Sequence, residues 1–429
     1  MLKAPDFAAV RVAAGTLKNP LLASLALDPR KDFTPDELAV VAVVVSPRLR
    51  ALRDQRGVAN SQVMQAGLLP NPQLSYLIDR PAGNSGITGL VTAQTLGLGW
   101  ELTSLLGRSD RIAGAKATAG ALDLDIAWQE WQVAQDVRLR AFRVLSLGAR
   151  LPFLRTIEKD LAENLVASRK GFDRHLYLGA GLVAMASAWR QAQADRLASE
   201  QALADDQATL RLVLNLPSDS VLPLRAETES IGLQNMADAD GWLAGLETRR
   251  LDLVALRLGY ESQEAGLRAA VRAQFPKIGL NFSRANDTSN VRTNGFGLTV
   301  DLPLFDRNQA GIAAAEATRR ALFDEYVVRV AEARSEVAEG LARIARVRAQ
   351  LDAVETALPE LKQRADAANH ALADGAIDAA SARTAQADWS TQQVEQLRLR
   401  QDFFELHVAL EIASGRPGAA TANPPEKSR

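Results

Sequence analysis

The stretch NGFGLTVDLPLFDRNQAGIAAAEA, residues 294–317, changes its pattern halfway along. In its first half the apolar residues Phe296, Leu298 and Val300 alternate with small or polar residues, which is the period of a β-strand with one apolar face. After a proline and a polar turn, an alanine-rich segment continues without proline as far as Pro359. The stretch therefore predicts an amphipathic strand of about ten residues that leads into a very long helix.

The chain contains two copies of this pattern. A shift of 204 residues places 47–78 over 251–282, and a shift of 200 residues places 96–118 over 296–318. The coinciding identical residues include Leu49 and Leu253, Ala51 and Ala255, Leu52 and Leu256, Pro72 and Pro276, Leu98 and Leu298, and Ile112 and Ile312. The difference between the two shifts falls in Gly- and Asn-rich segments that resemble hairpin turns, where changes of length are tolerated.

Each copy predicts a helix, two strands joined by a hairpin, a long helix and a return helix. The predicted strands are 71–80, 89–102, 276–285 and 294–303, the long helices 108–172 and 309–372, and the return helices 182–214 and 377–414. The predicted organisation is an N-terminal extension at 1–33, a first repeat at 34–216, a linker at 217–237, a second repeat at 238–415 and a disordered tail at 416–429. The fold class is mixed α/β, built mainly from long antiparallel α-helices.

Composition and charge exclude several classes of function. The 50 basic and 51 acidic residues give a net charge of −1, which argues against nucleic acid as a partner. The chain has no cysteine, its three histidines are far apart, and no catalytic or phosphate-binding motif is present, so we expect no enzyme activity, no metal site and no cofactor. The longest apolar run, LAVVAVVV at 38–45, is too short for a membrane-spanning helix.

The beginning of the chain gives no sign of an export signal. Its first 25 residues carry scattered charges and no compact apolar core, so they predict no secretory signal peptide. Without cysteine, a lipid anchor on that residue type is not expected either.

The four strands have the length of transmembrane β-strands. A small soluble sheet packed on helices is the alternative for any single strand, but four matched strands that each adjoin long helices favour a membrane. Four strands leave two open edges, which a bilayer does not tolerate, and they are too few to close a barrel. Three chains would supply twelve strands, so the sequence predicts a homotrimer.

Three motifs carry a resemblance to a known family. They are AGLLPNPQLSY at 66–76, RRLDLVALRLGYESQEAGLRAAVRAQFPKIGL at 249–280 and LTVDLPLFDRNQAGIAAAEA at 298–317. Together they resemble the TolC family of outer-membrane efflux proteins, and the form LPLFDRNQ is most similar to the branch that serves metal-cation pumps. The resemblance implies a trimeric 12-stranded β-barrel in the outer membrane on an α-helical barrel in the periplasm. It also implies two protein partners, a periplasmic adaptor and an inner-membrane pump, with metal cations or small toxic compounds as cargo.

Candidate site residues follow from these expectations. On the strands, the residues expected to face outer-membrane lipid are Leu280, Phe282, Phe296, Leu298 and Val300, with Asn281, Ser283 and Thr299 facing the lumen. At the turns between long helices, the resemblance implies adaptor contacts at Gly179, Gly181 and Gly375; helix capping alone is the other reading of these glycines.

A gate at the periplasmic end is a further expectation. Where relatives often place two acidic residues after the tip glycine, this chain has Ser381 and Thr384. The nearest carboxylates are those of Asp374 and Asp378, which are either gate residues or ordinary solvated acids.

Two other functions stay open at this point. A coiled-coil scaffold protein with a small sheet would fit the missing signal peptide but not the four strands of membrane length. A related outer-membrane duct that secretes a protein or peptide would share the same fold.

Overall fold

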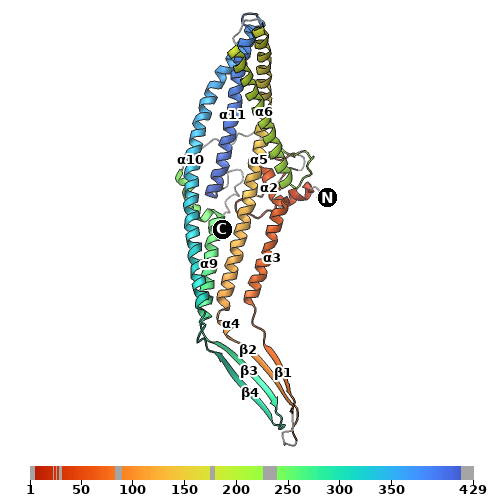
Figure 1. Cartoon of the computed structure of the whole chain (residues 1–429), viewed down its shortest axis with the longest axis vertical. Coiled ribbons are helices and arrows are strands. Elements are labelled where there is room, and N and C mark those ends of the chain that lie inside the picture. The colour runs from red at the N-terminus through yellow and green to blue at the C-terminus, as the bar shows by residue number, and fades with distance from the viewer. Residues whose placement is uncertain are drawn as a thin grey trace. The chain divides into compact units, whose positions relative to one another are not determined.

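The computed structural model describes residues 5–22, 24–25, 27–28, 31–82, 89–173, 179–225 and 239–416. Figure 1 shows its helices and strands in chain order. They are α1 (Phe7–Ala14), α2 (Pro35–Val45), α3 (Pro47–Gly67), β1 (Gln73–Asp79), β2 (Ala93–Glu101), α4 (Thr103–Leu106), α5 (Arg108–Asp173), α6 (Gly179–Val213), α7 (Ala239–Leu243), α8 (Leu246–Arg249), α9 (Leu251–Arg272), β3 (Lys277–Asn286), β4 (Arg292–Asp301), α10 (Gln309–Ala373) and α11 (Ala379–Ser414).

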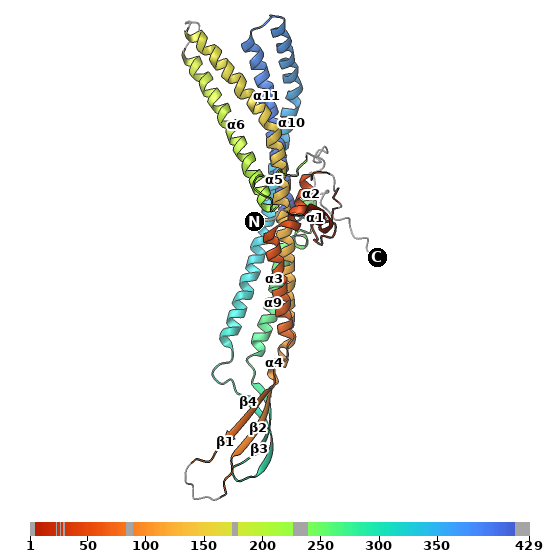
Figure 2. The same ribbon diagram turned by 90° about the vertical axis from the view of Figure 1, so that its right-hand side faces the viewer.

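The predicted long helices are confirmed. Helices α5 and α10 are 66 and 65 residues long, and each continues through its internal proline, Pro152 or Pro359. Their return helices α6 and α11 have 35 and 36 residues. Figure 2 shows α6 beside the end of α5 and α11 beside the end of α10, as two helical hairpins.

The four strands are also confirmed, although their ends differ from the predicted ones, and turns explain the starts of β2 and β4. Strand β2 begins at Ala93 and not at residue 89, because Gly89 adopts the left-handed conformation at φ 94° and the chain turns there. Strand β4 begins at Arg292, two residues before the predicted start. The reason is a tight turn in which the Asp287 carboxylate accepts hydrogen bonds from the backbone N–H groups of Ser289 and Val291. The pairing of β3 with β4 therefore continues up to this turn.

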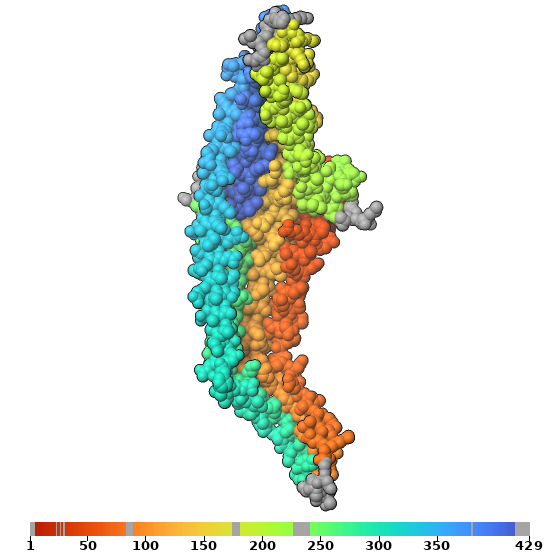
Figure 3. Space-filling model, in the orientation of Figure 1, coloured from red at the N-terminus to blue at the C-terminus, as the bar shows by residue number. Residues whose placement is uncertain are grey.

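The chain forms two compact units, and each unit takes segments from both repeats. The first unit draws on 1–51, 127–250 and 331–429, and the second on 52–126 and 251–330. The repeats are therefore sequence units and not separately packed bodies. In the space-filling view the sheet of the second unit shows orange residues of the first repeat next to teal residues of the second (Figure 3).

The core of the first unit surrounds α2. A capping box starts this helix: the Thr34 hydroxyl accepts from the Glu37 N–H, and the Glu37 carboxylate accepts from the Thr34 N–H. The apolar run that follows is almost fully buried against α5 and α6, with the following residues in one cluster: Leu38, Val40, Val41 and Ala42 from α2, Val137, Ala141 and Val144 from α5, and Leu210 with Leu214. The apolar run at 38–45 is thus a core helix.

The second unit contains one antiparallel sheet in the order β1-β2-β3-β4 together with α3, α9 and the adjoining parts of α5 and α10. Ion pairs join its helices. Arg56 lies 2.9 Å from Asp123, and the buried Asp110 is 2.6 Å from Arg272 and 3.4 Å from Arg268. Asp110 therefore attaches the start of α5 to the end of α9, next to the strands.

Candidate functional site: an exposed sheet face and a helix tip

One face of the sheet carries three consecutive apolar side chains from every strand. Residues that are paired across antiparallel strands point to the same side. The register therefore groups Leu74, Tyr76 and Ile78 of β1, Leu96, Leu98 and Trp100 of β2, Ile278, Leu280 and Phe282 of β3, and Phe296, Leu298 and Val300 of β4. We call these twelve residues the apolar band. Eleven of them are exposed, Phe296 to 77%, whereas soluble proteins seldom expose so many apolar side chains together.

The apolar band is present in both copies of the internal repeat. The shift of 204 residues places the β1 triplet on the β3 triplet, and the shift of 200 places the β2 triplet on the β4 triplet. All five residues expected to face lipid are members of the band, on the same face of β3 and β4. That they share a face is confirmed, while their contact with lipid stays a prediction.

The opposite face combines glycine with small polar side chains. Along one row Ser75 pairs with Gly97, which pairs with Ser283, which pairs with Gly295. A Cβ at Gly97 would lie 2.5 Å from the Ser75 Oγ, and one at Gly295 would lie 2.7 Å from the Ser283 Oγ. Glycine at these positions therefore leaves room for the serine side chains of the neighbouring strands. The expected luminal residues Asn281, Ser283 and Thr299 all lie on this face.

The junction between strands and helices is held by polar contacts. The Trp100 indole N–H donates to the Pro70 carbonyl at 2.8 Å, and the Leu102 N–H donates to the Ile278 carbonyl at 2.9 Å. Asp306 lies close to the start of α10 but does not cap that helix. Its carboxylate accepts from the Asn308 N–H in a local turn, and Asn308 is the residue directly before the helix.

The tip between α10 and α11 has a defined geometry. Gly375 lies in the left-handed region at φ 72°, its N–H donates to Leu372, and the Ala376 N–H donates to Ala371. This pair of bonds is a Schellman motif, which ends a helix and requires a residue that tolerates positive φ. Gly375 is thus a helix cap, and its role in adaptor contact stays a prediction.

The other tip lies partly outside the described residues, which resume at Gly179. Gly179 is the first residue of α6, and Gly181 lies in its first turn, where a Cβ would meet no atom within 4 Å. His175 is outside the described part of the chain.

The four candidate gate residues lie together on the exposed surface of the α10–α11 tip. Asp378 is the N-cap of α11, because its carboxylate accepts from the Ser381 N–H at 2.7 Å. Asp374 directly follows the last residue of α10, and its N–H donates to the His370 carbonyl. Ser381 and Thr384 are exposed in the first turns of α11. Asp378 therefore stabilises the start of α11, and a gating role for it stays a prediction.

A buried polar cluster in the first unit was missed by sequence reasoning. The Arg138 guanidinium lies 2.5 Å from the Asp36 carboxylate and 2.6 Å from that of Glu411. Glu411 is fully buried, and its other oxygen lies 3.0 Å from the His407 Nε2. Burial raises the pKa of Asp36, with Arg138 opposing the shift and Glu411 adding to it. The cluster joins α2, α5 and α11, whose residues are too far apart in sequence for any local pattern to pair them.

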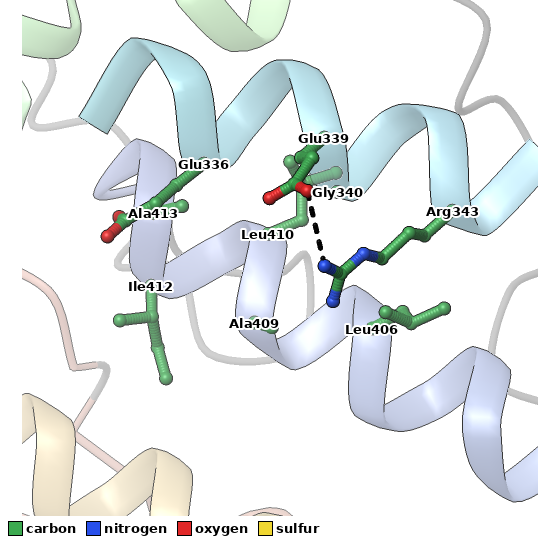
Figure 4. A pocket seen from close by; sticks show the side chains of 9 residues that line it. All are labelled: Glu336, Glu339, Gly340, Arg343, Leu406, Ala409, Leu410, Ile412 and Ala413. Atoms are coloured by element: carbon green, nitrogen blue, oxygen red, sulfur yellow. Dashed lines mark hydrogen bonds and ion pairs between the residues drawn. The ribbon is translucent and has the colours of Figure 1, made fainter. Parts of the chain in front are cut away.

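A groove of about 340 Å³ runs between α10 and α11 in the first unit (Figure 4). Its floor is apolar, with Leu406 and Leu410 of α11 facing Gly340 of α10. Its charged rim is already paired, since Glu339 lies 3.3 Å from Arg343 and Glu336 lies 3.4 Å from Arg250. The groove therefore presents apolar surface and not an ion site.

The described residues contain neither a cluster suited to a metal ion nor a helix suited to crossing a membrane. Within residues 5–416, apart from the gaps stated above, no group of three or more His, Asp or Glu side chains is arranged to hold a metal ion. In the same residues, no helix combines the length and the apolar character needed to cross a bilayer.

Solved structures of other proteins share this fold over most of the chain. OprN, an outer-membrane channel, is 14% identical with a TM-score of 0.70, covering 97% of this chain and 99% of OprN. CusC, described in terms of folding and transmembrane channel formation, is 18% identical with a TM-score of 0.65, covering 97% and 98%. VceC, an outer membrane protein of Vibrio cholerae, is 16% identical with a TM-score of 0.67, covering 89% and 96%. The fold is thus that of outer-membrane channel proteins.

The sequence comparison agrees with this fold over the second half of the chain. Residues 242–416 match the family described as Outer membrane efflux protein. The search of curated protein sequences finds no match. The chain is thus similar to outer membrane efflux proteins by sequence over residues 242–416, and it has the fold of outer-membrane channel proteins over nearly its whole length.

Proposed function

We propose that the protein is the outer-membrane channel of a tripartite efflux system, a passive duct that crosses the outer membrane and extends into the periplasm. The observation that carries this proposal is the apolar band. Twelve apolar side chains on one face of an isolated four-stranded sheet are unfavourable in water and favourable in a bilayer.

The outline of the apolar band supports a membrane position. The centres of its triplets are Tyr76, Leu98, Leu280 and Leu298. The position of each centre can be compared with the residue paired with the centre of the preceding strand. The centre of β2 lies two residues closer to the helices than the residue paired with the centre of β1, and the centre of β3 lies two residues closer than the residue paired with the centre of β2. The centres of β3 and β4 are paired with each other. Four residues at ~3.4 Å each, across three strand spacings of ~4.8 Å, make a slope of about 45°. Strands of membrane barrels have about this tilt, so the band would lie level in a bilayer.

The sheet edges support a trimer. β1 and β4 are the two edge strands, and their outer hydrogen-bonding groups need partners inside a membrane. Because β1 and β4 run in opposite directions, β4 of one copy can pair antiparallel with β1 of the next copy, which closes a ring. Three copies would give twelve strands, and the glycine-rich face would line the inside.

The helical hairpins support contacts with other proteins at the periplasmic end. We assign adaptor contact to the tips at Gly179, Gly181 and Gly375, and energy supply to an inner-membrane pump. Selection of cargo, whether metal cations or small toxic compounds, would also lie in that pump. In this arrangement Asp374 and Asp378 with Ser381 and Thr384 would surround the narrow entrance of the duct.

The proposal is tested by location and conductance. The full natural product should be recovered in the outer-membrane fraction, and the purified protein should form trimers that conduct ions in planar bilayers. Recovery in the soluble fraction as monomers without conductance would refute the proposed function and favour a scaffold protein.

The gate is tested by variants that separate charge from capping. Asp378→Asn removes the charge while asparagine still caps the helix, and Asp374→Asn is combined with it. If these carboxylates surround the entrance, the double variant loses cation preference at low salt, where screening is weakest. An unchanged preference would leave the two aspartates as surface acids.

A further inference from the structure

The apolar band ends differently at its two ends. At the hairpin end, the register places Gln94 of β2, Arg284 of β3 and Asn294 of β4 next on the same face, with Arg292 one step farther. The alternation of β1, continued past its last paired residue, adds Arg80. At the helix end, the next residues are Pro72, Leu102, Pro276 and Leu302. Arginine therefore borders the band at the hairpin end, whereas apolar residues and proline border it at the helix end.

The internal repeat contains the same border. The shift of 204 residues that places the β1 triplet on the β3 triplet also places Arg80 on Arg284. The shift of 200 places Gln94 on Asn294. Each hairpin thus has an arginine directly after its first apolar triplet and an amide directly before its second.

The arginines at this border have no ion-pair partner among the described residues. Arg80, Arg284 and Arg292 are exposed, and no described residue forms a hydrogen bond or ion pair with their guanidinium groups. The nearby Asp79 pairs with Ala93 and points to the other face, and the Asp287 carboxylate is bound to backbone N–H groups of its own turn. Three permanent positive charges per chain therefore lie at this edge, without direct contact to the carboxylates of Asp79 and Asp287, which are the nearest negative charges.

The spacing of two of these arginines suits a phosphate group. Arg292 pairs with Asn286 and Arg284 pairs with Asn294, so the two arginines are diagonal neighbours on adjacent strands, whose separation is about 7–8 Å. Two guanidinium groups at this separation can approach one phosphate from both sides, each through paired N–H donors.

We infer that Arg80, Arg284 and Arg292 bind phosphate groups of lipid headgroups in the leaflet around the hairpin end of the barrel. This inference rests on the proposed function, because it needs the apolar band to lie in a bilayer. The triplet of apolar side chains below each arginine then contacts the acyl chains of the same lipids. The arginines fix the depth of the barrel, and they give that leaflet a preference for anionic lipids that the helix end lacks.

The test uses the full-length trimer and vesicles of two compositions. Wild-type protein is mixed with vesicles of pure phosphatidylcholine or of phosphatidylcholine with phosphatidylglycerol, and bound protein is measured by flotation at low and high salt. At ~1 kcal/mol for each arginine near an anionic surface, the wild-type preference for anionic vesicles should be at least about tenfold at low salt and should weaken with salt. The variant Arg80→Gln/Arg284→Gln/Arg292→Gln should lose this preference.

The control variant is Arg48→Gln/Arg320→Gln/Arg346→Gln, which changes three exposed helix arginines and the net charge equally. It should keep the wild-type preference, and both variants should still float with pure phosphatidylcholine and remain trimers. Equal binding of wild type to both vesicle types, or an equal loss in the control, would overturn the inference while leaving the channel intact. Failure of the wild type to float with either vesicle would refute the proposed function, and the inference with it.

Discussion

A lysine placed on either face of β4 distinguishes a membrane sheet from a soluble one. Leu298 is the centre of its apolar triplet, and its neighbour Thr299 is exposed on the glycine-rich face. If the band lies in a bilayer, Leu298→Lys puts an ammonium group near the midplane at a cost of ~2–4 kcal/mol per chain, or about 6–12 kcal/mol for a trimer. Thr299→Lys replaces a β-branched residue and loses a hydrogen bond from Asn281, which costs about 1 kcal/mol.

The assay is the free energy of unfolding in phosphatidylcholine vesicles, from urea titrations followed by tryptophan fluorescence and by the mobility of the unheated protein on gels. Leu298→Lys should shift the transition strongly or prevent assembly, and Thr299→Lys should resemble wild type. A soluble sheet would tolerate both changes, since both positions would then face water. Equal effects at the two positions would therefore refute the membrane assignment of the band.

Three further predictions concern the helical parts. Arg138→Met should destabilise the first unit by about 3–5 kcal/mol in chemical denaturation, because it leaves Asp36 and Glu411 buried without a cation; a loss below 1 kcal/mol would contradict this. Because burial raises the folded-state pKa of Asp36, the folded chain holds a proton at pH values where the unfolded chain has lost it, and stability falls as pH rises from about 4 through the raised pKa. Asp36→Asn should flatten this decline above about pH 4, and an unchanged slope would show that another group causes it. Gly375→Ala should lower the melting temperature at a cost of about 1–2 kcal/mol, since alanine at φ 72° is strained, while Gly181→Ala in an open helical position should not.

Much of the architecture could be predicted from local patterns. The period-two alternation at Phe296, Leu298 and Val300 located β4, and uninterrupted helix-forming segments located α5 and α10 within one residue of their ends. These signals are local, because the periods of strands and helices are recognised from residues close together in the sequence. The ends of β2 and β4 were predicted less well, since a tight turn through Asp287 makes polar residues part of the ladder.

The candidate sites were predicted unevenly for a related reason. The residues expected to face lipid followed from alternation alone, and the register confirmed that they share a face. The N-cap role of Asp378 is local and could have been recognised from its position before Ser381. The cluster of Arg138, Asp36 and Glu411 could not, because its members meet only when helices from both repeats pack together.

The division of each compact unit between both repeats has a consequence for biosynthesis. The salt bridge from Arg138 to Glu411 spans 273 positions, so the first unit, which includes residues 331–429, cannot be completed until the last helix has left the ribosome. Long-range contacts of this kind close late and slowly. A nascent chain with this topology cannot finish folding its first unit while synthesis continues. The interleaving of the repeats therefore delays completion of the fold until the whole polypeptide has been made.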